Sequence, residues 1–173
     1  VHLGIGAHKD LNNVLENLLG SPDQRILFLC DRALVSTEFF KSIEGILKET
    51  GRPFDLFSEI DAEPTDTIVE KVYERCKMNQ PSLILAVGGG SAIDIGKAVG
   101  ILIPHGGSIR DYEGTEKYKG SRVPLVAIPT TAGTGSEVTG SCIITNTLTG
   151  VKMSITHSTL NPANIAILDP LAL

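Results

Sequence analysis

The sequence predicts an α/β domain with a doubly wound parallel sheet, and three observations favour this fold class. Short, continuous apolar runs of strand length alternate along the chain with longer segments of helical periodicity. The runs lack the polar alternation of a half-exposed strand, which indicates burial on both faces, as in a parallel sheet. The connections are short, so right-handed crossovers would place the strands side by side, with ligands beyond their carboxyl ends.

The first part of the chain is expected to form one helix and then alternating strands and helices. Apolar side chains recur at helical spacing up to Gly20, a typical helix end, and a later helical segment opens at Ser36 and closes at Gly51. The expected elements are a helix over 10–19, a strand over 25–30, the helix between Ser36 and Gly51, a strand over 54–60 and a helix over 67–78.

The next strand–helix unit is the one around which the chain is organised. The apolar run 83–87 is stopped by three glycines, 88–90, and Ser91, a residue type that caps helices, precedes a densely apolar helix. The first turn of a helix has unpaired backbone N–H groups and a partial positive charge, which favour a phosphate, and glycines let it approach. Three glycines alone fit a tight turn without a ligand equally well.

Neither standard phosphate-binding fingerprint fits this turn. A G-x-G-x-x-G motif from Gly88 would need glycine at Ile93, and a P-loop would need glycine at Ser91. Lys97 is followed by Ala98 rather than by the serine or threonine that holds magnesium, so ATPase chemistry is not favoured.

Asp31 directly follows the strand over 25–30, where the carboxyl ends of a parallel sheet hold ligands. An acidic side chain at this position can accept hydrogen bonds from a ribose diol, and its charge would repel a 2′-phosphate. Capping of the next helix is the alternative role, and position alone leaves both open.

A second chemically dense segment follows a fourth buried strand over 124–130. The residues from Thr130 to Glu137 offer three threonine hydroxyls, a serine and two glycines at the same predicted sheet edge as the glycine turn. They predict donors for a phosphate or ribose, with a hydroxyl-rich loop without a ligand as the alternative. The preceding segment, 102–120, is expected to be a surface loop.

The end of the chain breaks the strand–helix alternation. Short strands are expected over 141–146, 152–156 and 165–168, separated by turns, and together they suggest a hairpin-like flap. Lys152 lies on this flap, where it could reach back to a pyrophosphate or remain solvated.

Composition excludes several classes of function. A net charge of −5 without a basic cluster argues against nucleic-acid binding, and no apolar run is long enough to span a membrane. Three widely spaced cysteines do not suggest disulfides and favour a reducing, cytoplasmic setting. The four histidines fit no metal-binding spacing and are expected at the surface or in loops. The 173 residues suit one domain, and the ends at Val1 and Leu173 suggest a piece of a longer protein.

Two segments together closely resemble the signatures of the iron-dependent, or group III, alcohol dehydrogenases. They are VGGGSAIDIGKA (87–98) and the more specific IPTTAGTGSEVT (128–139). Supporting matches are Gly4-x-Gly6 before a helix, Asp31, Pro64-Thr65, Lys152 and the closing run 167–170, so the resemblance covers Leu3 to Pro170.

The resemblance implies that residues 1–173 form the amino-terminal, Rossmann-like NAD(P)-binding domain of such an enzyme, without the helical metal-binding domain. It implies that Gly89, Gly90 and Ser91 contact the pyrophosphate and that Asp94 approaches the nicotinamide end. Thr130, Thr131 and Thr134 would line the cofactor path, and Lys152 would hold a ribose hydroxyl. Asp31 matches the family position associated with NAD rather than NADP.

The resemblance also implies an oxidoreductase that moves a hydride between nicotinamide and a small alcohol or its aldehyde or ketone. The family's metal ligands, for Fe or Zn, would lie beyond Leu173, so this chain alone is expected to be inactive and to contain no catalytic residue. We expect a homo-oligomer. The alternatives are the corresponding domain of a glycerol dehydrogenase or dehydroquinate synthase, which match the 130–139 loop less well, and a non-catalytic nucleotide- or phosphate-binding module.

Overall fold

A computed structural model describes all residues, 1–173. Its centre is a six-stranded sheet in the order β1-β9-β6-β4-β2-β3, in which every neighbouring pair is parallel. The strands of this sheet are β1 (His2–Leu3), β2 (Ile26–Asp31), β3 (Phe54–Ile60), β4 (Leu83–Gly88), β6 (Leu125–Pro129) and β9 (Ile165–Leu168). The expected doubly wound α/β fold is confirmed.

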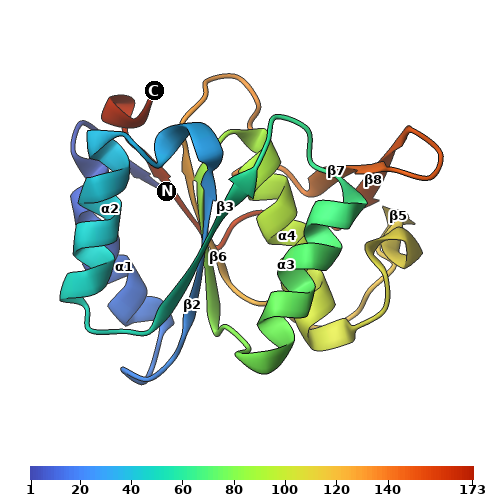
Figure 1. Cartoon of the computed structure of the whole chain (residues 1–173), viewed down its shortest axis with the longest axis horizontal. Coiled ribbons are helices and arrows are strands. Elements are labelled where there is room, and N and C mark those ends of the chain that lie inside the picture. The colour runs from blue at the N-terminus through green and yellow to red at the C-terminus, as the bar shows by residue number, and fades with distance from the viewer.

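Helices cover both faces of the sheet (Figure 1). The helices are α1 (Leu11–Leu18), α2 (Glu38–Glu49), α3 (Asp66–Met78) and α4 (Gly90–His105), with short 3₁₀ turns η1 (Ala7–Asp10), η2 (Arg32–Leu34), η3 (Ile109–Tyr112) and η4 (Pro170–Ala172). The first two long helices pack on one face and the other two on the opposite face, which gives two separate hydrophobic cores. No helix is both long and apolar enough to cross a membrane.

A small second sheet lies beside α3 and α4 (Figure 1). It consists of β5 (Gly114–Thr115), β8 (Val151–Thr156) and β7 (Ser141–Asn146), of which the last two form an antiparallel hairpin. The inward side chains of this hairpin join the core that α4 forms with the main sheet. The predicted flap therefore exists, and it sandwiches α4 between two layers.

The last strand and the loop before β6 differ from expectation. Residues 165–168 do not belong to the flap, because β9 pairs in parallel with both β6 and β1. Its unbroken apolar run, with Ala166 and Ile167 buried, is typical of a parallel strand. The expected surface loop, 102–120, is also more ordered: α4 continues to His105, and Ile109 and Tyr118 are buried.

The turn of the hairpin is held to α3 by one buried carboxylate. Asp66, fully buried, accepts hydrogen bonds from the Thr147 N–H at 3.2 Å and from the Arg110 Nε at 2.7 Å. Burial alone would raise the pKa of this carboxyl, but the two donors hold it below its ordinary value. Asp66 thus connects three segments that are distant in sequence.

We expect Asp66→Asn to destabilise the domain by about 2–3 kcal/mol, because it replaces a charge-accepting oxygen with a donor that faces Thr147 and Arg110. Urea unfolding gives the difference. The matched control is Asp55→Asn, which breaks an exposed pair with Arg25. Equal effects of the two substitutions would contradict the structural role of Asp66.

Candidate functional site

The candidate site lies where the strand order of the main sheet reverses. The chain adds β3 on one side of β2 and then returns to add β4 on the other, so the carboxyl ends of β2 and β4 diverge at this point. Ligands of open α/β sheets bind at such a position. Asp31 ends β2 here, and Gly88 ends β4.

The glycine turn after β4 is packed so closely that side chains would not fit. Gly88 has φ +155°, and a Cβ there would lie 2.6 Å from the Asp31 Cγ. A Cβ on Gly90 would lie 3.0 Å from the Ser136 Oγ. The turn is therefore bare backbone, held between the end of β2 and the hydroxyl-rich loop.

The turn leads into the amino end of α4 without a side-chain cap. Gly89, and not Ser91, is the N-cap residue, and no side chain bonds to the first-turn N–H groups. The expectation that Ser91 caps the helix is wrong, because Ser91 lies inside the first turn and its hydroxyl donates to the Ala62 carbonyl at 2.5 Å. The uncapped end of this 16-residue helix favours an anion.

Asp31 faces the glycine turn rather than the helix after it. Its Oδ2 accepts the Gly89 N–H at 2.7 Å, and it makes no capping bond to η2, so the capping alternative is wrong. Its Oδ1 is buried and has no partner. Burial raises the pKa of this carboxyl, and the Gly89 bond offsets part of the rise. One carboxylate oxygen is thus left for a donor that the chain itself does not supply.

Two hollows meet over the glycine turn and form one elongated groove. The first, about 540 Å³, includes Asp31, Gly89 and Thr131, and the second, about 350 Å³, includes Asp94, Thr134 and Lys152. Both are lined by Ala62, Gly90 and Ser91. The middle of the groove is therefore the uncapped end of α4, with polar side chains toward both ends.

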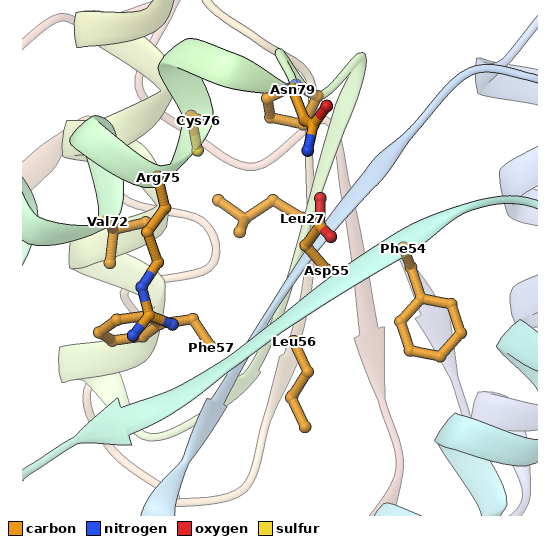
Figure 2. A pocket seen from close by; sticks show the side chains of 10 residues that line it. Leu27, Phe54, Asp55, Leu56, Phe57, Val72, Arg75, Cys76 and Asn79 are labelled. Atoms are coloured by element: carbon orange, nitrogen blue, oxygen red, sulfur yellow. The ribbon is translucent and has the colours of Figure 1, made fainter.

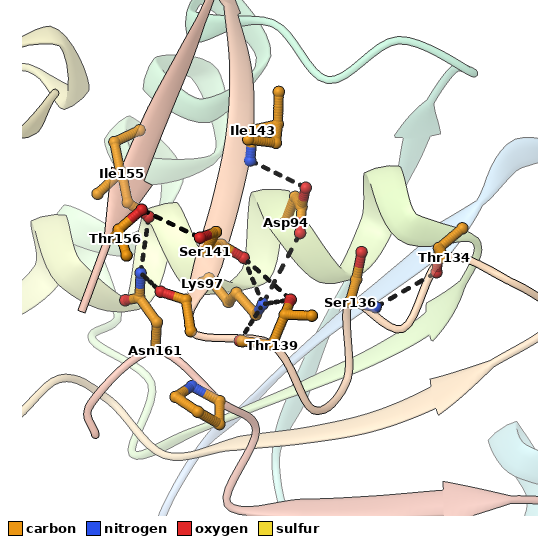
Figure 3. Close-up of polar contacts among 12 residues, drawn as sticks. Asp94, Lys97, Thr134, Ser136, Thr139, Ser141, Ile143, Ile155, Thr156 and Asn161 are labelled. Atoms are coloured by element: carbon orange, nitrogen blue, oxygen red, sulfur yellow. Dashed lines mark hydrogen bonds and ion pairs between the residues drawn. The ribbon is translucent and has the colours of Figure 1, made fainter. Parts of the chain in front are cut away.

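Figure 3 shows a buried Asp–Lys pair on α4, of which Asp94 also lines the second hollow. The Asp94 Oδ2 accepts the Ile143 N–H at 3.0 Å, while its Oδ1 is buried, has no hydrogen-bond partner and lies 3.9 Å from the Lys97 Nζ. The Lys97 Nζ donates to the carbonyls of Thr139 and Ser141 at 2.9 and 2.7 Å. Burial raises the pKa of the Asp94 carboxyl and lowers that of the Lys97 ammonium. The pair fixes the start of the flap against α4.

The structure brings most of the predicted site residues together. Eight of the nine line the groove: Asp31, Gly89, Gly90, Ser91, Asp94, Thr131, Thr134 and Lys152. Thr130 does not; its N–H donates to the Gly88 carbonyl at 2.9 Å and supports the turn from behind.

Sequence reasoning missed other residues of the groove, of which Arg32, Asp61 and Thr145 are polar, while Ser136 was expected only as part of the hydroxyl-rich segment. Arg32 and Asp61 directly follow β2 and β3, so the carboxyl-end rule could have found both. Lys97 was also missed, although it is the single lysine of a densely apolar helix and lies three residues after Asp94. One turn of helix places these two side chains on the same face.

Another hollow offers no unpaired charged group. It lies between β3 and α3, measures about 290 Å³ and is lined mostly by apolar residues (Figure 2). Its charged members are paired, Arg75 with Glu59 at 2.9 Å and Asp55 with Arg25 at 3.0 Å. No three His, Cys, Asp or Glu side chains are grouped as a metal site requires, and the three cysteines are buried and unpaired.

One histidine departs from expectation. His8 is not at the surface but only 4% exposed, and its Nδ1 forms a short hydrogen bond to the Asp169 Oδ2. The partner lies 161 residues away in sequence and meets His8 because β1 and β9 pair. Local spacing gives no signal for such a pair.

Comparison with known proteins gives consistent matches over nearly the whole chain. The family model for iron-containing alcohol dehydrogenase matches residues 1–170. The NAD-dependent methanol dehydrogenase of Bacillus methanolicus is 34% identical over 168 residues, 97% of this chain and 43% of the relative. The 1,3-propanediol dehydrogenase of Citrobacter freundii is 41% identical over 125 residues, 72% of this chain and 32% of the relative.

Solved structures match equally well. A 1,3-propanediol oxidoreductase superposes with a TM-score of 0.92 at 33% identity and covers 99% of this chain. The sulfoacetaldehyde reductase of Bifidobacterium kashiwanohense, in complex with NAD⁺, superposes with a TM-score of 0.86 at 28% identity. This chain covers 44% of each of these two structures, so it spans less than half the length of the relatives it matches.

Proposed function

Since the chain belongs to the iron-containing alcohol dehydrogenase family, we propose that residues 1–173 form the nicotinamide-dinucleotide-binding domain of a dehydrogenase that converts an alcohol to an aldehyde or ketone. NAD is the cofactor we propose, with NADP disfavoured. The methanol dehydrogenase of Bacillus methanolicus is NAD-dependent, and the sulfoacetaldehyde reductase was solved with NAD⁺, which supports this choice.

One observation carries the proposal: the groove has an uncapped helix end at its middle and a partly buried carboxylate toward each end, Asp31 on one side and Asp94 on the other. A dinucleotide has a matching arrangement of groups, because its anionic pyrophosphate lies between two ribosides that carry hydroxyl donors. Buried polar atoms without a partner are rare in proteins, so the Asp31 Oδ1, which has neither a hydrogen bond nor an ion pair, favours a ligand that brings a donor to this carboxylate. The bare backbone of the glycine turn gives the space that a pyrophosphate needs.

Each residue then has a role that its position supports. The free N–H groups of Gly90 and Ser91 would bind the pyrophosphate at the amino end of α4. Gly89, whose own N–H donates to Asp31, would give the close backbone approach beside it. The Asp31 carboxylate would accept a hydrogen bond from the adenosine ribose, and Asp94 would lie at the nicotinamide end. Thr131 and Thr134 would line the path, and Lys152, exposed on β8, would reach a ribose hydroxyl or the pyrophosphate. When bound, NAD supplies the hydride acceptor.

These residues do not fit the metal that the family's name implies, because no three His, Cys, Asp or Glu side chains are grouped as a metal site requires. We therefore assign no step of the reaction to a metal here and expect this chain alone to turn over no alcohol. The substrate is proposed only as a small alcohol or its carbonyl product. The homo-oligomeric state and the cytoplasmic location remain predictions.

A fluorescence titration of the chain with NADH tests the proposal. We expect saturable binding, and we expect Lys152→Met to weaken it about three- to tenfold, because a lysine near the pyrophosphate contributes a charge-assisted contact. The matched control is Lys119→Met, which removes an exposed lysine outside the groove. Absence of NADH binding would contradict the proposal. If the chain bound inorganic pyrophosphate but not NADH, a phosphate-binding module would be favoured instead.

A further inference from the structure

The hollow on the Asp31 side of the glycine turn contains three charged side chains. Asp31, Arg32 and Asp61 all line it, and Arg32 is its single cation. The Arg32 Nε lies 3.5 Å from the Asp61 Oδ1, while the side chains of both residues remain about two-thirds exposed. The cation of this hollow is therefore already paired with a carboxylate.

This pairing matters for how the hollow would treat the two nicotinamide dinucleotides. A 2′-phosphate adds a dianion beside the adenosine ribose, and arginine is the side chain best suited to bind it, through two parallel N–H donors. An arginine next to the ribose site would ordinarily admit NADP. Here the arginine is engaged by Asp61, and Asp31 adds a second carboxylate close to the same position.

We propose that Asp61 is a second residue that determines cofactor specificity, because it holds Arg32 away from the position of the 2′-phosphate. The inference rests on the proposed NAD-binding function. Two effects then act together. The Asp31 carboxylate repels a 2′-phosphate, and Asp61 keeps Arg32 paired, so that the arginine cannot neutralise the charge of that phosphate. An exposed ion pair contributes little to stability, so Asp61 can be replaced without loss of the fold.

The two effects should be coupled. With Asp61 replaced and Asp31 present, the freed Arg32 faces a carboxylate as well as the phosphate. With Asp31 replaced and Asp61 present, the phosphate meets an arginine that is still paired. Only the removal of both leaves Arg32 available to an unopposed 2′-phosphate, so the gain in NADPH affinity should exceed the product of the single gains.

The test is a double-mutant cycle on the 173-residue chain with Asp31→Ser, Asp61→Asn and both, in which the dissociation constants of NADPH and NADH are measured. We expect each single variant to raise the NADPH-to-NADH affinity ratio about three- to tenfold and the double variant to raise it about a hundredfold or more. Adding Arg32→Ala to the double variant should remove the part of the gain that Asp61→Asn contributes and leave only the gain of Asp31→Ser. Because Asp31 also accepts the Gly89 N–H, Asp31→Asn serves as a second variant if Asp31→Ser fails to fold.

The matched control is Asp55→Asn, which breaks an exposed Arg–Asp pair outside the groove and should leave the ratio unchanged. An unchanged ratio in Asp61→Asn, in both Asp31 backgrounds, would overturn the inference while NADH binding by the natural chain still supported the proposed function. A contribution of Asp61→Asn to the ratio that survives Arg32→Ala would overturn it as well. Absence of NADH binding by the natural chain would overturn both.

Discussion

Gly88→Ala is expected to lose at least tenfold in NADH affinity and about 3–4 kcal/mol in the free energy of unfolding. A Cβ at this position would lie 2.6 Å from both the Cγ and the Oδ2 of Asp31 and 2.8 Å from the Ala92 Cβ. Rotation of Asp31 would relieve the first contact, but it would break the bond to the Gly89 N–H. Ala92 cannot move away, because it is buried in α4. The turn itself must shift, and the pyrophosphate site shifts with it.

The control for Gly88→Ala is Gly4→Ala. Gly4 has φ +147°, close to the +155° of Gly88, but a Cβ there would meet nothing within 4 Å. Both substitutions therefore cost about 1–2 kcal/mol of unfolding free energy for placing an alanine at a positive φ, while the clash and the loss of NADH binding are specific to Gly88. Chemical denaturation and the NADH titration measure the two effects separately. Similar losses of stability, with NADH affinity intact in both variants, would contradict the role of the glycine turn.

The main sheet could be predicted because its strands carry their signal locally. The run 54–60 is β3 as predicted, and the predicted 25–30 and 124–130 differ from β2 and β6 by one residue at each end. Continuous apolar runs of this length are typical of parallel strands that are buried on both faces. The edge of the sheet was not predictable in the same way, because β1 has only two residues and exists through its pairing with β9.

The site was predictable where residue type and position agree. Glycines, hydroxyls and a carboxylate that follow strand ends fall at one edge of a parallel sheet, and the structure brings Asp31, the glycine turn and two of the three threonines to one groove there. Asp94, inside α4, was expected there only from the family resemblance, and Lys152 from its place on the flap. Contacts between residues distant in sequence carried no such signal. The hydrogen bonds of the Lys97 ammonium to Thr139 and Ser141 depend on how the flap folds back over α4. The sequence alone does not contain that geometry in any local pattern.

Asp169→Ala is expected to be among the most destabilising single substitutions in this chain, at about 3–5 kcal/mol. Its carboxylate is almost fully buried and accepts the N–H groups of Gly6 and His8 at 3.1 Å and that of Leu171 at 3.0 Å, besides the His8 imidazole. The imidazole in turn contacts the Ser42 Oγ at 3.0 Å, so one side chain connects the first turn, α2 and the end of β9. Its removal leaves several buried donors without an acceptor.

The matched control for Asp169→Ala is Asp10→Ala. Asp10 also pairs with a histidine, His2, at 2.8 Å, but both side chains are more than one-third exposed. Water can replace the lost partner there, so we expect a change below about 1 kcal/mol. Urea unfolding at neutral pH measures both variants. A comparable loss in the two would show that burial of the His8–Asp169 contact contributes nothing.

The acid dependence of unfolding tests the same carboxylate in the natural chain. Burial would raise the pKa of Asp169, but the donors on His8, Leu171 and Gly6 outweigh it and lower the pKa from 3.8 to about 2. Because the folded-state pKa is the lower one, the contribution is complete above about pH 5 and disappears as the pH falls through 3.8 toward 2. The difference in unfolding free energy between the natural chain and Asp169→Ala should therefore shrink by about 2 kcal/mol across that window. A difference that is constant from pH 5 to about pH 2 would mean that the destabilisation comes from lost packing and not from the ionised carboxylate.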